Sequence, residues 1–355
     1  MPLRIPYSLI LALGGAAIVT LLMPAVTRLA WRIGAVAQPG PRHVHHEPVP
    51  RLGGLAMAVA VLGVSWLAVM LPGPGHLLDR RHLIGLSCAA IPVLALGLVD
   101  DTRGLGPVIK LVLQACGALV LTTFGYGVSR ITNPFGSELL SGPFNIPLTV
   151  VWVLLVMNAI NLIDGLDGLA AGVVLIASMT LWWAGRLHAD FYVMFLVAPL
   201  AGAAFGFLFH NFPRARVFMG DTGSQFLGLA LAAASLLENR KGTATVTLLF
   251  PLVALGLPIA DGVLAFTRRL FHGKPVFRAD SSHIHHRLLH LGLTPTQATV
   301  SLWVLSALLG VTAIVLAQMP RAFGWVLLIL MALALALAFE LLEAIDRHVR
   351  RRDGD

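Results

Sequence analysis

The chain has 355 residues, of which 57% are hydrophobic and only 12% are charged. An average soluble domain carries about 25% charged residues, so this composition excludes an ordinary soluble globular protein. It predicts an all-α, polytopic integral membrane protein. The formal net charge of +8 is attributed to cytoplasmic loops rich in Arg and Lys, with anionic lipid or phosphate ligands near them. Nucleic acid is not expected as a partner.

Eleven apolar stretches of the chain are long enough to cross about 30 Å of hydrocarbon as helices. In chain order they cover residues 7–29, 52–71, 81–99, 107–124, 146–163, 168–185, 191–209, 223–236, 244–265, 296–317 and 323–343. No separate soluble domain is visible. We therefore expect one transmembrane domain over residues 1–355, ending in a short basic cytoplasmic tail at 344–355.

Basic residues are unequally divided between the two sides of the membrane. The loops after odd-numbered stretches, together with the C-terminal tail, carry 15 Arg and Lys residues, and the other side carries seven. Loops rich in Arg and Lys stay in the cytoplasm. The N-terminus is therefore expected outside and the C-terminus in the cytoplasm.

Four polar residues interrupt the apolar pattern in the segment NAINLIDGLDGL. Asn158, Asn161, Asp164 and Asp167 are spaced three residues apart, so they share one face if the segment is helical. Carboxylates and amides at the end of an apolar span are costly and indicate a site for an ion or a polar substrate. The alternative is a solvated turn.

Two adjacent carboxylates, Asp100 and Asp101, end the third apolar stretch. Such a pair repels unless a cation or a shared proton relieves it, and carboxylate oxygens are the ligands that Mg²⁺ prefers. The alternative is a pair of interfacial acids facing water. Lys110 lies in the next stretch, where its ammonium could reach back to the same surface and contact a phosphate.

A glycine-rich turn, FMGDTGSQFLG, precedes the eighth apolar stretch. At the start of a helix such a turn offers free backbone N–H groups to anions. Asp221 in this turn would hold a metal that bridges to the anion. The alternative is an ordinary helix cap made by Asp221 or Thr222.

Imidazole and guanidinium groups are concentrated in the segment PVFRADSSHIHHRLLHLG, residues 275–292. Its basic residues are Arg278, His283, His285, His286, Arg287 and His290. The spacing does not match familiar structural zinc sites, and no cysteine is close. Binding of a pyrophosphate or nucleotide is favoured, with zinc binding and a solvated basic loop as alternatives.

All of these clusters fall on the side assigned to the cytoplasm, which predicts one site built from several loops. Acids for Mg²⁺ beside Arg, Lys and His for phosphate oxygens are the equipment of phosphoryl transfer. An ion-coupled secondary transporter is the main alternative, but it would place its acids near the membrane midplane and show an internal repeat. The sequence has neither the GxxxxGK[ST] pattern of ATP-driven proteins nor the HExxH pattern of metalloproteases.

Four motifs together resemble the polyprenyl-phosphate N-acetylhexosamine-1-phosphate transferases, glycosyltransferase family 4. They are VDD at 99–101, NAINLIDGLDGLAAG at 158–172, FMGDTGS at 218–224 and FRADSSHIHHRLL at 277–289. The resemblance implies transfer of a sugar-1-phosphate from a UDP-sugar to undecaprenyl phosphate or a related polyprenyl phosphate, with release of UMP. It also implies Mg²⁺ or Mn²⁺ as cofactor and a cytoplasmic-face active site in the bacterial inner membrane. Homodimerisation is left open.

The resemblance also implies roles for individual residues. Asp221 would bind the metal together with Asp164, and Asp100, Asp101, Asp164 and Asp167 would be catalytic. The form HIHHRLL resembles members that use UDP-GlcNAc, with phospho-MurNAc-pentapeptide translocase-type activity as the alternative. The residues expected to bind substrates are Lys110, Asn158, Asn161, Arg278, His283, His285, His286 and Arg287. Among them, Lys110 would bind the lipid phosphate.

The chain departs from the family pattern at three positions. In the first loop, Gln38 and His43 stand where family members commonly have Asp and Lys. Gly104 stands where many relatives have a third acid after the Asp pair. No metal site of the DDxxD type is therefore assigned.

Overall fold

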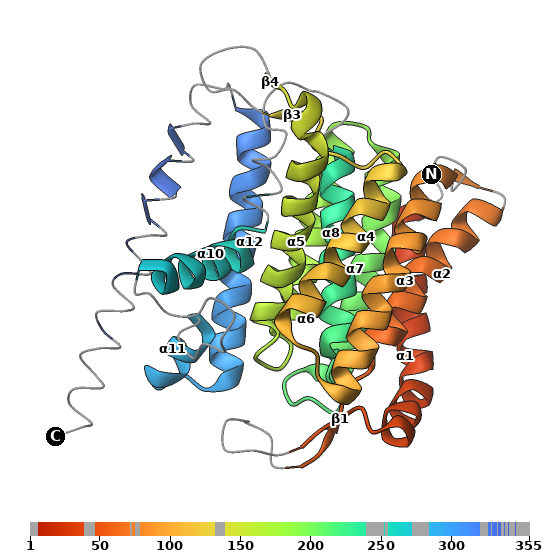
Figure 1. Cartoon of the computed structure of the whole chain (residues 1–355), viewed down its shortest axis with the longest axis vertical. Helices are drawn as coiled ribbons and strands as arrows, with labels where there is room; N and C mark the ends of the chain where they lie inside the picture. The colour runs from red at the N-terminus through yellow and green to blue at the C-terminus, as the bar shows by residue number, and fades with distance from the viewer. Residues whose placement is uncertain are drawn as a thin grey trace, which may run out of the picture.

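The computed structural model describes residues 6–38, 47–71, 73–74, 79–131, 139–238, 252, 255–271 and 284–319, and separate positions between 326 and 345. The described chain is mostly helical (Figure 1). The helices are α1 (Tyr7–Ile33), α2 (Gly53–Met70), α3 (Arg80–Arg103), α4 (Pro107–Thr123), α5 (Asn145–Ile163), α6 (Leu169–Leu187), α7 (Phe191–Asn211), α8 (Gly220–Glu238), α10 (Gly256–Phe271), α11 (Ile284–His290) and α12 (Pro295–Gln318).

Two short antiparallel hairpins complete the described secondary structure. In the first, β1 (Val36–Ala37) pairs with β2 (Val49–Pro50), and Val36 lies opposite Pro50. In the second, β3 (Arg130–Ile131) pairs with β4 (Leu139–Leu140), and a 3-10 turn, η2 (Gly142–Phe144), leads into α5. The two hairpins lie at opposite ends of the helix bundle in Figure 1.

Membrane-spanning character follows from helix length and composition. Seven of the described helical segments are long and apolar enough to cross a membrane, counting η2 and α5 as one. The protein is therefore a multi-pass membrane protein, as its composition predicts. Helix α4 is apolar but shorter. The first eight predicted stretches and the tenth correspond to described helices, with ends shifted by a few residues.

The ninth predicted stretch, 244–265, has the wrong bounds. The described helix α10 begins at Gly256 and ends at Phe271, and Figure 1 shows it lying across the other helices. It is strongly amphipathic, a pattern that suits a helix at an interface better than one surrounded by hydrocarbon. Residues 244–251 and most of the eleventh stretch, 323–343, lie outside the described residues.

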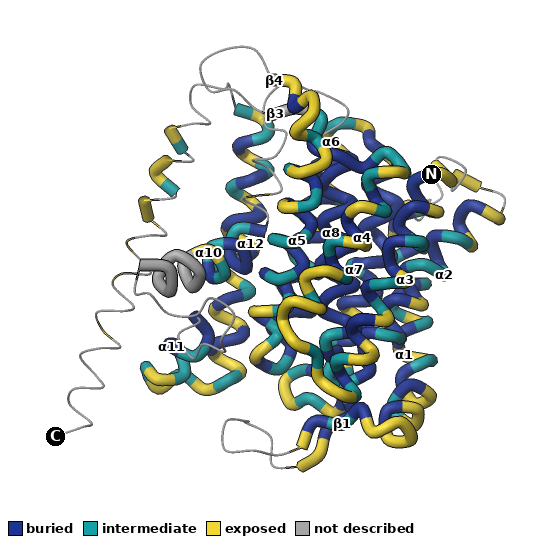
Figure 2. Tube along the Cα trace, viewed as in Figure 1, coloured by how far each residue is buried: buried dark blue, intermediate teal, exposed yellow. Residues whose placement is uncertain are grey.

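Helix α8 forms the centre of the bundle. It packs against α2, α3, α5, α6 and α7, and every residue from Thr222 to Leu237 is buried. Figure 2 shows the buried segments concentrated around α7 and α8. Gly54 of α2 and Gly97 of α3 permit this packing, because a Cβ on either would overlap the backbone of α8. Small residues thus bring the start of α8 against α2 and α3.

Several helix ends meet at one end of the bundle. Figure 1 shows that α3 and α5 end there and that α4, α8 and α12 begin there, beside β1 and β2. A backbone hydrogen bond attaches β2 to the segment that precedes α8, because Phe218 N–H donates to the Pro50 carbonyl over 2.8 Å. We call this the acidic end, after Asp100, Asp101, Asp164, Asp167 and Asp221.

Local sequence signals determine where two of these helices start. Helix α4 opens with Pro107, and α12 opens with Pro295 after a capping box in which Thr294 and Gln297 bond to one another's backbone N–H. Proline in the first turn and a Thr-x-x-Gln box both satisfy or remove N–H groups that have no partner within the helix. These signals set the starts that place Lys110 and the α11–α12 connection at the acidic end.

Candidate functional site

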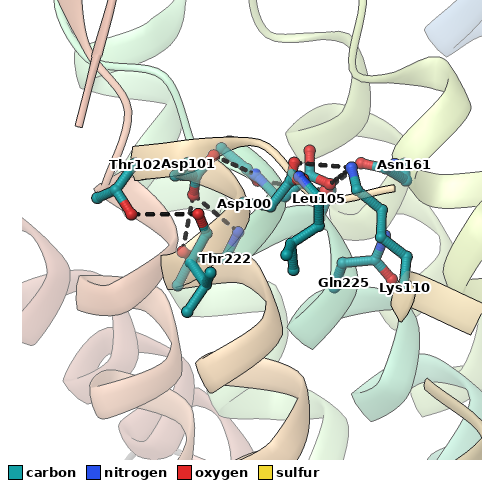
Figure 3. A network of polar contacts seen from close by, with 12 residues as sticks. Asp100, Asp101, Thr102, Leu105, Lys110, Asn161, Thr222 and Gln225 are labelled. Atoms are coloured by element: carbon teal, nitrogen blue, oxygen red, sulfur yellow. Dashed lines mark hydrogen bonds and ion pairs between the residues drawn. The ribbon is translucent and has the colours of Figure 1, made fainter. Parts of the chain in front are cut away.

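A lysine lies between two carboxylates at the centre of the acidic end. Lys110 Nζ donates to Asp100 Oδ2 and to Asp221 Oδ2, each over 2.7 Å. The three side chains come from α4, α3 and α8, and Figure 3 shows Lys110 directed toward Asp100. Their exposed fractions are 24%, 13% and 16%, so the ion pairs are only partly screened by water. Lys110 therefore does reach back to the surface of the acid pair, where it contacts Asp100, and its contact with a phosphate stays a prediction.

Asp100 is fixed by its own local turn as well as by Lys110. Its Oδ1 accepts the Leu105 N–H over 2.6 Å, in the turn that links α3 to α4. The Lys110 ammonium therefore faces a carboxylate that is already oriented. An incoming third anion, such as a phosphate, could contact the remaining N–H of Lys110, because an ammonium has three donors.

Asp101 points to a different partner from its neighbour. Its carboxylate accepts from Asp221 N–H (2.9 Å), Thr222 N–H (3.0 Å) and the Thr222 hydroxyl (2.7 Å). Asp101 of α3 therefore caps the start of α8, and it is only 5% exposed.

Two expectations for the FMGDTGS turn are corrected by this contact. We expected its free N–H groups to bind an anion, or Asp221 or Thr222 to act as the cap. The carboxylate of Asp101 already occupies the N–H groups of both residues. The reason is tertiary: Gly97 lets α3 approach the start of α8 closely enough for direct capping.

The four polar positions of NAINLIDGLDGL do not share one helical face. Helix α5 ends at Ile163, so only Asn158 and Asn161 are helical, and Asp164 and Asp167 lie in the turn before α6. Asn161 Oδ1 accepts the Ser224 hydroxyl over 2.7 Å, which joins α5 to the first turn of α8. Gly165 and Gly168 interrupt the helical pattern, and Gly168 has φ of 77°, which favours glycine.

Asn158, itself partly buried, belongs to an amide cluster that the sequence reasoning missed. Its Nδ2 donates to Gln114 Oε1 over 2.9 Å, and Gln114 Nε2 donates to Gln225 Oε1 over 2.7 Å. Gln114 and Gln225 are at most 1% exposed. A glutamine within each of two apolar stretches is itself a detectable signal, since an amide in a span needs a partner.

Asp167 holds neighbouring segments in place. Its Oδ2 accepts the Ala215 N–H over 2.9 Å, and its carbonyl accepts the Thr299 hydroxyl over 3.2 Å. The α5–α6 turn is thereby tied to the segment before α8 and to α12. These contacts give Asp167 a structural role, and its predicted catalytic role stays a prediction.

Asp164 lies among like charges. It follows α5 directly, outside the spanning helices. Asp164 is partly buried, and this burial, followed by the charges of Asp221 and Asp101, raises its pKa well above the ordinary value. The negative charges of Asp221 and Asp101 therefore disfavour ionisation of Asp164.

The donor set at the acidic end fits Mg²⁺. Among the described residues, no group of three or more His, Cys, Asp or Glu side chains is arranged to hold a metal. Mg²⁺, however, is commonly held by one or two carboxylates together with water and substrate phosphates. Asp164 and Asp221 both lie at the acidic end, and the charge of Asp221 contributes to the raised pKa of Asp164. Their assignment as metal ligands stays a prediction.

The histidine segment reaches the acidic end through α11. The His285 imidazole lies beside Gly165, where a Cβ would overlap its ring. The His285 and His286 ring centroids are 4.3 Å apart, and Arg287 is buried. His285 thus lies at the α5–α6 turn with His286 beside it, whereas Arg278 and His283 lie outside the described residues.

Asp261 of α10 is a second polar residue that the sequence reasoning missed. It is 1% exposed, and its Oδ1 accepts the Ile284 N–H at the start of α11 over 3.0 Å. The signal was present as a single acid in the apolar segment PIADG. Taken singly, such an acid does not reveal which distant backbone group it binds.

Comparison with known proteins agrees with this site. Residues 83–239 match the family model described as glycosyl transferase family 4. A probable undecaprenyl-phosphate N-acetylglucosaminyl 1-phosphate transferase of Bacillus subtilis (strain 168) is 35% identical over 315 residues, which is 88% of this chain and 85% of that protein.

Two further relatives come from other bacteria. The decaprenyl-phosphate N-acetylglucosaminephosphotransferase of Mycobacterium tuberculosis (strain ATCC 25618 / H37Rv) is 37% identical over 319 residues, 81% of this chain and 78% of that protein. The undecaprenyl-phosphate alpha-N-acetylglucosaminyl 1-phosphate transferase of Escherichia coli (strain K12) is 28% identical over 355 residues, 94% of each chain. The motifs and these matches agree, and the chain belongs to glycosyl transferase family 4, the polyprenyl-phosphate N-acetylhexosamine-1-phosphate transferases.

Proposed function

We propose that this protein transfers GlcNAc-1-phosphate from UDP-GlcNAc to a polyprenyl phosphate and releases UMP. The single observation that carries the proposal is the Lys110 ammonium, held between Asp100 and Asp221 at 2.7 Å from each. A fixed cation beside clustered carboxylates suits a reaction between two phosphate groups, in which positioning and charge stabilisation supply most of the catalysis. The names of the family relatives support the same acceptor and sugar.

The lipid phosphate acts as the nucleophile. A phosphate monoester has a second pKa of about 6, so it is largely a dianion at neutral pH and needs no general base. One of its oxygens attacks the sugar-linked phosphorus of UDP-GlcNAc in line with the leaving group. The bond from that phosphorus to the UMP oxygen breaks, and UMP leaves with the electron pair.

The residues of this chain divide the positioning between them. Lys110 binds the lipid phosphate, and Asp100 and Asp221 hold the ammonium in place. Asp101 fixes the first turn of α8 and therefore the direction of the Asp221 side chain. A direct ion pair with Lys110 supports an orienting role for Asp100 over a role as base or covalent nucleophile.

Asp221 and Asp164 would hold the divalent cation, Mg²⁺ or Mn²⁺. When bound, the cation would supply neutralisation of the charge that develops on the leaving UMP. Burial is the main cause of the raised pKa of Asp164, and the charge of Asp221 is the next. This second contribution supports the assignment, because carboxylates that repel one another favour a cation between them.

The active site is proposed to face the cytoplasm of a bacterial inner membrane, with the N-terminus outside and the C-terminus inside. The support is that the helix ends that carry the acidic clusters meet at one end of the bundle (Figure 1) and that the basic loops predict the same side. Eleven spans and a homodimer stay predictions.

One assay tests the proposed function. Detergent-solubilised protein is mixed with Mg²⁺, polyprenyl phosphate and UDP-GlcNAc, and UMP release and the lipid-linked product are measured together. UDP-GalNAc and UDP-MurNAc-pentapeptide are compared against the same acceptor. We expect release with UDP-GlcNAc that requires the lipid. Preference for UDP-MurNAc-pentapeptide would replace the sugar assignment, and no release with any donor would favour a transporter.

A further inference from the structure

The α11 segment is held to the rest of the protein by an acid from another helix. Asp261 of α10 accepts the Ile284 N–H over 3.0 Å, and Ile284 is the first residue of α11. The Asp261 side chain is 1% exposed, and Ile284 is 3% exposed. This hydrogen bond is therefore shielded from water. A buried backbone N–H that has no acceptor is costly, so the bond matters for the stability of this segment.

The next residue along the chain contacts the acidic end directly. The His285 imidazole is 2% exposed and lies so close to Gly165 that a Cβ there would overlap Nε2. Gly165 follows Asp164, the predicted metal ligand. Glycine at this position therefore leaves room for the imidazole beside the acidic turn.

Helix α10 is itself packed against α5, the helix that leads into the same turn. A Cβ on Gly262, the residue after Asp261, would lie 3.5 Å from Leu162 Cδ1 near the end of α5. Helix α10 also packs against α12, which follows α11. The contacts thus close a ring that runs from the end of α5 through Gly165, His285, Ile284 and Asp261 back to α5.

A short helix depends on such external contacts. Helix α11 has seven residues, fewer than a helix needs to be stable alone in water. Its first N–H groups have no partner inside the helix, and a negative charge at this end is also favourable. An acceptor on α10 therefore determines where α11 begins and which way the side chain after Ile284 points.

We infer that Asp261 is a positioning residue for the nucleotide-sugar: through Ile284 it holds the His285 imidazole against Gly165 at the acidic end. The inference rests on the proposed function for the identity of the substrate. Asp261 acts through α11 and touches neither reacting phosphate. Loss of its acceptor is expected to weaken binding of UDP-GlcNAc while binding of the lipid phosphate, which depends on Lys110, is preserved.

The test measures the KM of each substrate separately. For Asp261→Ala we expect the KM for UDP-GlcNAc to rise about tenfold, the loss that removal of one cap or one supporting contact typically causes. The KM for polyprenyl phosphate should stay within about twofold. Asp261→Asn should restore the nucleotide KM, because its amide oxygen can still accept the Ile284 N–H.

Matched controls separate positioning from general stability. Asp190 is also a buried helix-capping acid, 2% exposed, and it caps α7 at the other end of the bundle. Asp190→Ala should lower the melting temperature without changing either KM. For the second contact, Gly165→Ala should raise the nucleotide KM, whereas Gly262→Ala should not, because a Cβ there meets Leu162 only at ordinary contact distance.

Binding of UMP is followed in parallel by its effect on the melting temperature. If wild type binds UMP but transfers no sugar phosphate, the proposed function fails, and a weaker UMP effect in Asp261→Ala still supports the inference. An unchanged nucleotide KM or UMP effect in Asp261→Ala overturns the inference alone. If Asp261→Ala does not fold, the same two measurements are made on Gly165→Ala. An unchanged nucleotide KM and UMP effect in that variant overturn the inference. A wild type that neither turns over nor binds UMP overturns both.

Discussion

The two ends of the bundle use acidic side chains differently. At the acidic end, hydrogen bonds and ion pairs join residues far apart in the sequence: Lys110 and Asp221 are 111 positions apart, and Asp101 and Asp221 are 120 apart. At the other end, Asp79 accepts from Arg81 N–H, two positions away, and Asp190 accepts from Tyr192 N–H, also two positions away.

The difference shows which end is built for chemistry. Asp79 and Asp190 each satisfy the start of their own helix, which is the ordinary structural use of an acid. At the acidic end two carboxylates share one ammonium, and burial together with the charges of Asp221 and Asp101 raises the pKa of Asp164. Gathering like charges opposes folding, so its persistence indicates a functional site.

The largest expected effect on turnover comes from removing the Asp221 carboxylate at the acidic end. Asp221→Ala removes a carboxylate that holds Lys110 and a proposed ligand of the cation. Turnover should fall by about 10³-fold, the upper range for loss of one charge-stabilising group, while the protein still folds. UMP release is measured across a Mg²⁺ titration, with melting temperature as the folding control. A wild-type rate at any Mg²⁺ concentration would refute the metal assignment.

Asp100→Asn tests whether the same end supplies a base or an electrostatic support. If Asp100 orients Lys110, turnover should fall by about 10²-fold to a similar extent at every pH. If Asp100 were a general base, the acidic limb of the pH profile would disappear. Rates of UMP release between pH 5.5 and 9 distinguish the two, and a changed limb would contradict the orienting role.

Asp101→Ala should lower the free energy of unfolding more than the removal of a helix cap at the other end of the bundle. It deprives two N–H groups and one hydroxyl of their buried acceptor. The expected loss is about 2–3 kcal/mol of the free energy of unfolding, measured by denaturation in detergent. The matched comparison is Asp190→Ala, which should cost about 1 kcal/mol. Equal losses would mean that the two acids have equivalent structural roles.

Asp164→Asn should change how stability depends on pH. Because the pKa of Asp164 is raised, the folded protein keeps a proton that the unfolded chain releases. Its contribution to stability is therefore complete at low pH and is lost as pH rises through the raised pKa. Metal-free wild type should melt at lower temperature as pH rises, and the variant should show a shallower slope. Parallel slopes would exclude this origin.

The smallest effect is expected at the far end of α3. Asp79→Ala removes the cap to Arg81 N–H and the 2.8 Å contact with His82 Nδ1. The cost should be about 1 kcal/mol in the free energy of unfolding, since both contacts are near the surface. UMP release per folded molecule should match wild type. A loss of turnover would show that the two ends are coupled.

Some of the site was predictable because its signals are local. Apolar length predicted the positions of most helices within a few residues, as for 107–124 and α4. Consecutive spans alternate in direction, so residues at the ends of α3 and α5 and at the start of α8 were expected at one end of the bundle, where Figure 1 shows them. The motif residues likewise predicted the family.

The partners of those residues were decided only by the tertiary structure. Asp100 and Asp101 are adjacent residues of the same type, yet Asp100 binds Lys110 and Asp101 caps α8. The close approach of α3 to α8 at Gly97 brings the Asp101 carboxylate to backbone groups that a sequence pattern assigned to an anion. Asp261 and Ile284 are likewise joined across two helices. Helix formation depends on nearby residues, whereas hydrogen-bond partners depend on how helices pack, and one sequence cannot specify that by local pattern.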